Sequence, residues 1–215
     1  MRNWAVIFVL LVLSLSLDGC AGKEKQQGAT APVFTPAELA AYEPQSRNLT
    51  PEQREIKDLL KKNGFKNPTA NPTIILVRKL PRRLTIYRGT TPLKTYPVVL
   101  GANPRNDKLY QGDHCTPEGV YRVVTKFDHP RWDKFILLDY PNMENWLKFS
   151  RAKKAGKVPF DAKIGGEIGI HGTHDPSMNI AGENWTMGCV SLLNQHIEEI
   201  YPLVDDDTLV VIKKE

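Results

Sequence analysis

The sequence predicts a mainly β domain, and three observations lead to this prediction. The 15 glycines and 16 prolines make up 31 of the 215 residues, which favours short segments joined by turns over a bundle of long helices. From Pro72 onward, short stretches rich in Val, Ile and Tyr follow one another with Gly or Pro between them. Hydrophobic residues form 41% and charged residues 25% of the chain, which is typical of a globular domain and excludes disordered and multi-span membrane classes.

Seven segments carry the β pattern, and helices are expected around and between them. The strands are expected at residues 74–77, 84–87, 96–100, 120–124, 135–138, 168–171 and 209–212. Helices are expected over 142–155 and 195–203, the second started by Asn194 as N-cap and interrupted near Pro202. A short helix over 50–63 is expected in front of the domain, because Thr50-Pro51-Glu52-Gln53 combines an N-cap, Pro at N1 and Gln at N3.

The start of the chain resembles an export signal. Arg2 is followed by a run from Ala5 to Leu17 that is apolar apart from interspersed serines. The run is shorter than the roughly 20 apolar residues of a membrane-spanning helix and stops at a charge. Residues 1–20 are therefore expected to be a signal peptide, and the protein is expected in an oxidising compartment outside the cytoplasm.

The end of this signal resembles a bacterial lipobox. In Leu17-Asp18-Gly19-Cys20 the cysteine would be lipidated and become the mature N-terminus, although Asp18 stands where a small residue is usual. Ala21, rather than Asp, follows the cysteine, so the expected location is the periplasmic side of the cell envelope, with the lipid on Cys20 in the outer membrane. The alternative is simple cleavage and release.

Between the signal and the domain lies a predicted tether, residues 21–71, which includes the short helix. Residues 21–48 are rich in Lys, Gln, Ala, Pro and Thr without sustained periodicity. The domain proper is expected over 72–215. The net charge of +5 suits an anionic partner but does not choose among cell wall, membrane and nucleic acid. Basic clusters at Arg78/Lys79, Arg82/Arg83 and Arg151/Lys153/Lys154 are expected on the solvated surface, and contact with an anionic polymer is the alternative.

His171 and Cys189 are the candidate chemical groups. His171 ends a predicted strand, and eighteen positions later Cys189 follows Gly188. A free thiol is only about 3% ionised at pH 7, so a nucleophilic cysteine needs a base such as an imidazole. Gly188 would let the backbone turn so that amides point at a developing oxyanion. Each residue taken singly is more often structural, and a zinc site with His174 and Asp175 is a further alternative.

Four ordered motifs containing these residues resemble the L,D-transpeptidase (YkuD-like) catalytic domain family. The motifs are Gly112-Asp113-His114-Cys115-Thr116-Pro117-Glu118-Gly119-Val120-Tyr121, Tyr140-Pro141-Asn142, Ile170-His171-Gly172-Thr173 and Thr186-Met187-Gly188-Cys189-Val190. The resemblance covers roughly residues 72 to 213. It implies a β-sandwich or barrel-like sheet with one or two packed helices, and it implies cell-wall chemistry.

The resemblance also implies roles for individual residues. Cys189 would be the nucleophile and His171 the general base and acid, oriented by the carbonyl of Gly172. The amides of Met187, Gly188 and Cys189 would be oxyanion donors, and the candidates for the substrate pocket are Thr186, Ser191 and His174. The thiolate would attack the carbonyl that joins the third residue of a peptidoglycan stem peptide to D-alanine. The thioester would then pass to an amine, of a stem or a wall-linked lipoprotein, or to water. No metal, organic cofactor or nucleic acid is implied.

Two residues depart from the family pattern. Ser191 stands where the family often has Arg, so a guanidinium that would anchor a substrate carboxylate is absent there. Cys115 lies in a loop motif that has no need of a thiol; it is expected to be structural, and the alternative is that it pairs with Cys189 on oxidation. The leading hypothesis is thus an exported cysteine acyltransferase. The alternatives are a hydrolytic member of the same family, either an L,D-carboxypeptidase or an amidase that releases a wall-attached protein, and an inactive envelope-binding lipoprotein.

Overall fold

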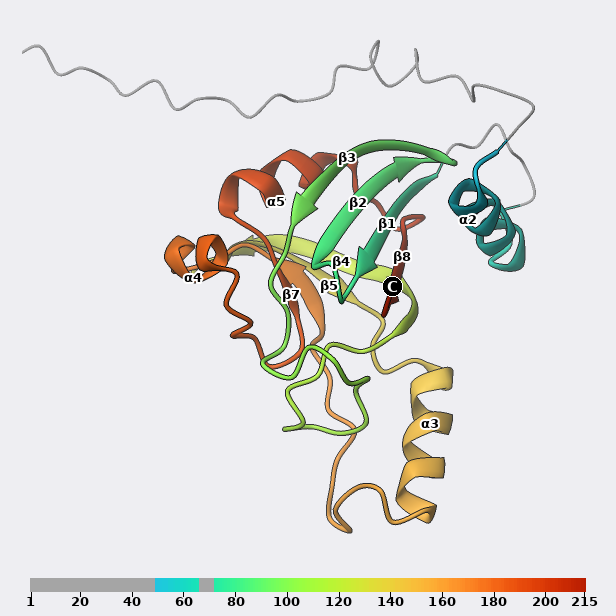
Figure 1. Cartoon of the computed structure of the whole chain (residues 1–215), viewed down its shortest axis with the longest axis vertical. Helices are drawn as coiled ribbons and strands as arrows, with labels where there is room; N and C mark the ends of the chain where they lie inside the picture. The colour runs from blue at the N-terminus through green and yellow to red at the C-terminus, as the bar shows by residue number, and fades with distance from the viewer. Residues whose placement is uncertain (1–48, 66–71) are drawn as a thin grey trace, which may run out of the picture. The chain divides into compact units, whose positions relative to one another are not determined.

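One sheet of eight strands forms the centre of the domain in this computed structural model (Figure 1). The structure describes residues 49–65 and 72–215, so the predicted signal, Cys20 and most of the tether lie outside the described residues. The strand order is β3-β2-β1-β8-β4-β5-β6-β7. The strands are β1 (Thr73–Arg78), β2 (Arg83–Arg88), β3 (Thr91–Pro97), β4 (Gly119–His129), β5 (Asp133–Leu138), β6 (Gly169–His171), β7 (Val190–Ser191) and β8 (Leu209–Lys213).

The two ends of this sheet approach each other. Five of the neighbouring pairs are antiparallel, while β1 with β8 and β6 with β7 are parallel. Just after β3, Val99 bridges to Ser191 of β7, and Gly101 bridges to Thr186. The sheet therefore curls toward closure, and the prediction of a mainly β, barrel-like fold is confirmed.

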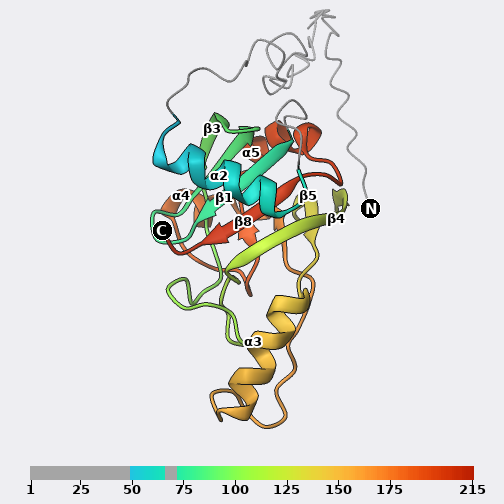
Figure 2. The ribbon, with the colours of Figure 1, turned by 90° about the vertical axis from the view of Figure 1, so that its right-hand side faces the viewer.

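The helices are α2 (Pro51–Lys62), α3 (Met143–Lys154), α4 (Pro176–Ala181) and α5 (Asn194–Ile200), and α5 continues as a 3-10 turn, η2 (Tyr201–Leu203). Figures 1 and 2 show α2 and α5 beside the sheet, whereas α3 extends away from one end of it. Thr50 and Gln53 form the predicted capping box of α2. In the part of the chain that the structure describes, no helix has the length and apolar character needed to cross a bilayer.

The start of α5 differs from the prediction. Its N-cap is Leu193, which offers no side-chain hydrogen bond, and Asn194 is the first helical residue. Asn194 Oδ1 instead accepts from the amide of Thr173 at 2.7 Å. Because the Asn194 carboxamide is already hydrogen-bonded to the Thr173 amide, it does not cap α5. The prediction failed because this contact joins residues far apart in the sequence.

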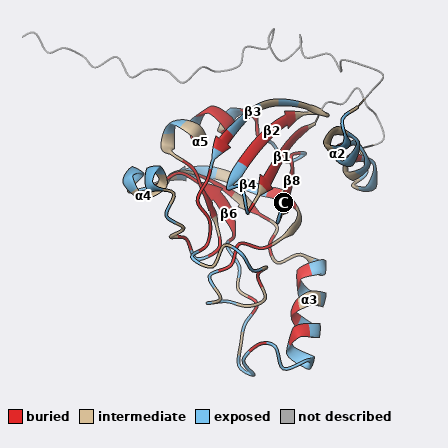
Figure 3. Cartoon of the chain, in the orientation of Figure 1, coloured by how far each residue is buried: buried red, intermediate tan, exposed pale blue. Residues whose placement is uncertain are grey.

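The core lies on both faces of the sheet, and Figure 3 shows the central strands as largely buried. Ile75 and Val77 of β1 face one hydrophobic cluster, whereas Ile74 and Leu76 face a second cluster that includes Ile56 of α2. Coverage on both faces explains why β1 is a continuous apolar run instead of an alternating one.

Lys79 lies in the interior, which corrects the expectation that the Arg78/Lys79 pair is solvated. Its ammonium donates to the carbonyls of Asn106 at 2.7 Å and Thr116 at 2.8 Å, and to Glu118 Oε1 at 2.9 Å. The lysine side chain is fully buried. It thereby ties loop 98–118 to the end of β1, and this loop forms part of the site described next.

Candidate active site

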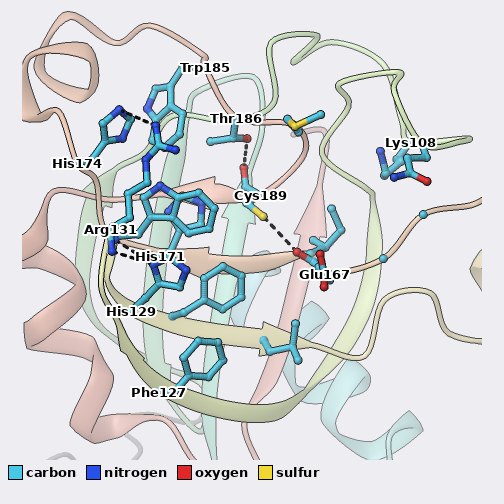
Figure 4. A pocket seen from close by; sticks show the side chains of 18 of the residues that line it. Lys108, Phe127, His129, Arg131, Glu167, His171, His174, Trp185, Thr186 and Cys189 are labelled. Carbon is cyan, nitrogen blue, oxygen red and sulfur yellow. Dashed lines mark hydrogen bonds between the residues drawn. The ribbon is translucent and has the colours of Figure 1, made fainter.

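A cavity of about 700 Å³ contains both candidate chemical groups on its wall. The β4–β5 hairpin, loop 165–168 and segment 185–189 line it together with part of loop 98–118 (Figure 4). His171 and Cys189 come from the adjacent parallel strands β6 and β7, in which Ile170 pairs with Val190 and His171 with Ser191. The parallel register therefore places the end of β6 beside the residue that precedes β7.

The His171 imidazole is fixed and buried. Its Nδ1 lies 2.7 Å from the carbonyl oxygen of Gly172, so Nδ1 donates and Nε2 remains available as the basic nitrogen. The ring stacks on Trp132, with centroids 4.5 Å apart, and on Phe135 at 5.5 Å. Burial lowers the pKa of His171 to about 4, although the hydrogen bond to Gly172 opposes the shift. The imidazole is therefore neutral at pH 7 and can accept a proton.

The Cys189 thiol rests in its protonated form. Its Sγ donates to the carbonyl oxygen of Glu167 at 3.5 Å. Burial raises the pKa of Cys189 to about 11, while the Gly169 amide and the charge of Lys108 pull it down only partly. A thiol in this state needs a base at the moment of attack, and the neutral His171 on the same cavity wall is suited to that task.

A glycine is needed at position 188 because the backbone of Cys115 comes very close to it. The Gly188 amide, however, does not have the predicted role. The φ of Gly188 is +141°, and a Cβ built there would lie 2.8 Å from the carbonyl oxygen of Cys115. The amide donates to Thr186 Oγ1 at 3.1 Å, and the Thr186 hydroxyl donates to the Cys189 carbonyl at 2.7 Å. The expectation that the Gly188 amide faces the oxyanion is therefore wrong in this structure, because the threonine hydroxyl holds that amide within the turn.

Ser191 was expected in the substrate pocket, and this expectation is wrong. The residue is fully buried and does not line the cavity. Its hydroxyl donates to the Gly172 carbonyl at 2.9 Å and accepts from Asn179 Nδ2 at 3.1 Å. The carbonyl that orients His171 thus receives two donors, and Ser191 acts behind the imidazole instead of on the substrate.

The chain of hydrogen bonds behind His171 includes residues that the sequence analysis did not identify. Asn179 Oδ1 accepts from Trp185 Nε1 at 3.0 Å, and Trp185 lines the cavity. Trp132 is a second unidentified wall residue. No local pattern marks these side chains, which reach the site from α4, its following turn and the β4–β5 hairpin. The predicted pocket residues Thr186 and His174 do line the cavity.

The Gly112–Gly119 motif shapes the loop beside the site. Asp113 pairs with Lys108 at 2.8 Å and accepts from the amides of Leu109, Tyr110 and Cys115. Burial opposes ionisation, but the hydrogen bonds from Lys108 and these amides outweigh it and lower the pKa of the Asp113 carboxyl. The carboxylate therefore organises the loop as a charged structural centre.

Cys115 is buried within this loop. Its thiol donates to the carbonyl of Asp113 at 3.3 Å, and burial raises its pKa to about 11. Cys115 and Cys189 are both free thiols in the structure. The contacts of Cys115 agree with a structural role, and its pairing with Cys189 on oxidation stays a prediction.

Within 49–65 and 72–215, no three His, Cys, Asp or Glu side chains converge as a metal site would require.

Ser191→Ala is expected to lower the turnover number about tenfold and leave KM unchanged. Loss of one of two donors frees the Gly172 carbonyl to move and relaxes the imidazole, and a hydrogen bond of this kind contributes about 1 kcal/mol or more. Steady-state kinetics on a stem tetrapeptide, the substrate expected from the sequence resemblance, would measure both constants. A raised KM with an unchanged turnover number would show instead that Ser191 touches the substrate.

Comparison with known proteins agrees with this architecture. A model of the L,D-transpeptidase catalytic domain, YkuD, matches residues 72–212. A Bacillus licheniformis protein that carries the name of the L,D-transpeptidase YkuD is 27% identical over 149 residues, which are 69% of this chain and 70% of that protein.

Two solved structures are also similar. The helical cell shape determining protein Pgp2 from Campylobacter jejuni aligns with a TM-score of 0.50 and 24% identity over 74% of this chain and 55% of its own. Bdellovibrio bacteriovorus Bd1075 aligns with a TM-score of 0.48 and 23% identity over 68% of this chain and 50% of its own. The chain thus spans about half the length of these structures. From the family model, which matches most of its length, this chain belongs to the L,D-transpeptidase (YkuD) catalytic domain family.

Proposed function

We propose that the domain is a cysteine acyltransferase that acts on peptidoglycan stem peptides through a thioester on Cys189. One observation carries the proposal: a neutral, buried His171, fixed through Nδ1, lines the same cavity as a free Cys189 thiol. An inactive envelope-binding protein would not need a base and a nucleophile at these two positions. The stem peptide is the substrate on which members of this family act.

The acylation step uses His171 first as base and then as acid. The Cys189 thiol leaves its contact with the Glu167 carbonyl and gives its proton to His171 Nε2 as Sγ bonds to the carbonyl carbon of the third stem residue. The resulting oxyanion is stabilised by the amides of Met187 and Cys189. The bond from that carbon to the D-alanine nitrogen then breaks, and the imidazolium returns the proton to the leaving amine.

The second step resolves the thioester. An acceptor amine or a water molecule gives a proton to His171 and bonds to the acyl carbon, and the departing sulfur takes the proton back. Water at about 55 M competes unless the amine is bound and oriented, and orientation can contribute roughly 7–11 kcal/mol. We propose transfer to an amine as the main outcome, and hydrolysis is the alternative because both reactions share the thioester.

The products of one reaction separate these functions. The full chain is incubated with disaccharide tetrapeptides, and the products are resolved by liquid chromatography with mass spectrometry. Cross-linked dimers together with free D-alanine are the expected result. Tripeptide and D-alanine without dimers would identify a carboxypeptidase. Absence of D-alanine would favour the inactive envelope-binding protein.

Export and lipid anchoring of the protein through Cys20 are also part of this proposal, and the lipobox-like Leu17–Cys20 sequence supports them. In the producing cell, Cys20→Ser is expected to move the protein from the membrane fraction to the soluble periplasmic fraction. Cys115→Ser is the matched control, because it removes a buried thiol and keeps the anchor. Unchanged partitioning of Cys20→Ser would show that this cysteine is not lipidated.

A further inference from the structure

We infer that Arg131 binds the carboxylate of the amino acid that leaves in the acylation step, and the carboxylate of the acceptor that replaces it. The inference rests on the proposed function and assigns a specificity-determining residue to it. Arg131 lies in the turn between β4 and β5 and lines the cavity. Its Nη2 lies 3.4 Å from Nε2 of His174, and Figure 4 shows its side chain running from the hairpin toward His174 and Trp185.

The base of the Arg131 side chain is held firmly. The turn has three residues, Pro130 to Trp132, and it is followed by Asp133 in the left-handed region at φ +62°. His129 Nδ1 accepts from the amides of both Arg131, at 3.2 Å, and Trp132, at 3.1 Å. The turn is therefore fixed by a side chain, and Arg131 leaves the backbone from a defined position.

Stacked aromatic rings also connect this turn to His171, the general base. The rings of His129 and Trp132 stack with centroids 4.4 Å apart, and Trp132 stacks on His171 at 4.5 Å. His174, the partner of the guanidinium, meets the edge of Trp185 at 5.4 Å, and Trp185 lies 5.7 Å from His171. One connected group of rings thus places Arg131 on the His171 side of the cavity.

The charge of Arg131 is not neutralised within the described residues. No acidic side chain of 49–65 or 72–215 forms an ion pair with it, and its contact with His174 uses one of five N–H donors. The other lysine or arginine on the wall, Lys108, differs in this respect. It is paired with Asp113, and both side chains are nearly buried, with 4% and 8% exposed. The guanidinium is therefore the cationic group that the cavity offers to a ligand.

The chemistry of the substrate places a carboxylate within this region. His171 protonates the leaving amine, so that amine must lie beside the imidazole, and in an amino acid the carboxylate is only one carbon away. The acceptor attacks from the position that the leaving group vacated, because the second step is the first in reverse with a different amine. An acceptor with a carboxylate next to its amine would use the same guanidinium, whereas water gains nothing from it.

Position 191 contributes no group to this carboxylate site. The guanidinium that the family often places after Cys189 is replaced here by the buried Ser191, which lies behind His171. Arg131, by contrast, comes from the hairpin and lines the cavity wall. Recognition of the carboxylate and orientation of the base are thereby divided between two residues.

The test compares Arg131→Gln with the unaltered full chain on two tetrapeptides, one ending in D-alanine and one in D-alaninamide. We expect kcat/KM of the unaltered protein to be about tenfold to a hundredfold lower on the amide, and Arg131→Gln to lose the same factor on the acid. On the amide peptide, kcat/KM of Arg131→Gln should equal that of the unaltered protein. Arg151→Gln on α3, an exposed arginine outside the cavity, is the matched control and should keep the full preference.

The outcomes separate this inference from the proposed function. If the unaltered protein releases D-alanine and Arg131→Gln keeps the preference for the acid, the assignment of Arg131 is overturned and the proposed function stands. Equal losses by Arg131→Gln on both peptides would also overturn it, because that pattern indicates a general structural effect. If the unaltered protein consumes neither peptide, the proposed function fails and this inference fails with it.

Discussion

Replacing Cys189 by alanine is expected to reduce D-alanine release from stem tetrapeptides below detection, and replacing His171 by alanine should lower it about 10²–10⁴-fold. The first change removes the atom that forms the thioester, and the second removes the base for a thiol whose pKa is about 11. The two residues act as one unit, so their effects are strongly non-additive. The double variant should therefore be no worse than Cys189→Ala. Release of D-alanine from a purified tetrapeptide measures all three variants.

Cys115→Ala is the matched control for this experiment. Cys115 is a second free thiol, buried in the neighbouring loop, and it does not line the cavity. The control should keep most of the activity, and thermal unfolding of each variant would show that the fold is retained. Turnover that survives in Cys189→Ala, or that disappears in Cys115→Ala while the fold persists, would contradict the assignment of the nucleophile.

Lys79→Met is expected to lower the free energy of unfolding by about 2–4 kcal/mol, because it removes a fully buried ammonium whose partner carboxylate, Glu118, is 26% exposed. Methionine nearly matches the volume of lysine but donates no hydrogen bond. The carbonyls of Asn106 and Thr116 and the carboxylate of Glu118 would lose their shared donor. Urea denaturation of the unaltered and altered proteins gives the difference.

Lys154→Met provides the comparison for Lys79→Met. Lys154 is an exposed lysine at the end of α3, and its replacement should change stability by no more than about 0.5 kcal/mol. A loss below about 1 kcal/mol for Lys79→Met would show that loop 98–118 does not depend on this ammonium. A loss of D-alanine release that accompanies the destabilisation would indicate that the loop supports the site.

Local patterns in the sequence predicted most of the elements correctly. The capping box at Thr50 and the β-type segments rely on interactions between near neighbours, and such interactions can be read from adjacent residues. One strand was misplaced, because the prediction of 96–100 overlaps β3 (Thr91–Pro97) only at Tyr96 and Pro97; most of β3 is exposed or half-buried and has few apolar residues to mark it.

The elements that were missed altogether are short. β7, with two residues, covers a single period of the strand pattern, and α4, with six, covers fewer than two helical turns, so neither repeats its pattern. β7 takes its form from its pairing with β6. α4 instead carries local signals that were overlooked, namely Asp175 as N-cap, Pro176 at its first position and the left-handed Gly182 at its end.

In the candidate site, too, local motifs revealed some residues, whereas others are placed only by the fold. His171 and Cys189 stand in recognisable motifs, and both were identified as candidates from the sequence. The side chain directions of Ser191 and Lys79 were misjudged, because the sequence does not show that each has a hydrogen-bonding partner far along the chain. Arg131 reaches the cavity only through the fold of the β4–β5 hairpin.

Intact-mass spectrometry of the full chain incubated with a stem tetrapeptide tests the central claim most directly. The account predicts a species heavier than the protein by the acyl part of the peptide without D-alanine, and peptide mapping should place this addition on Cys189. The species should disappear in Cys189→Ala and persist in Cys115→Ala. Release of D-alanine without any covalent species at short reaction times, or an addition that maps to Cys115, would contradict the account.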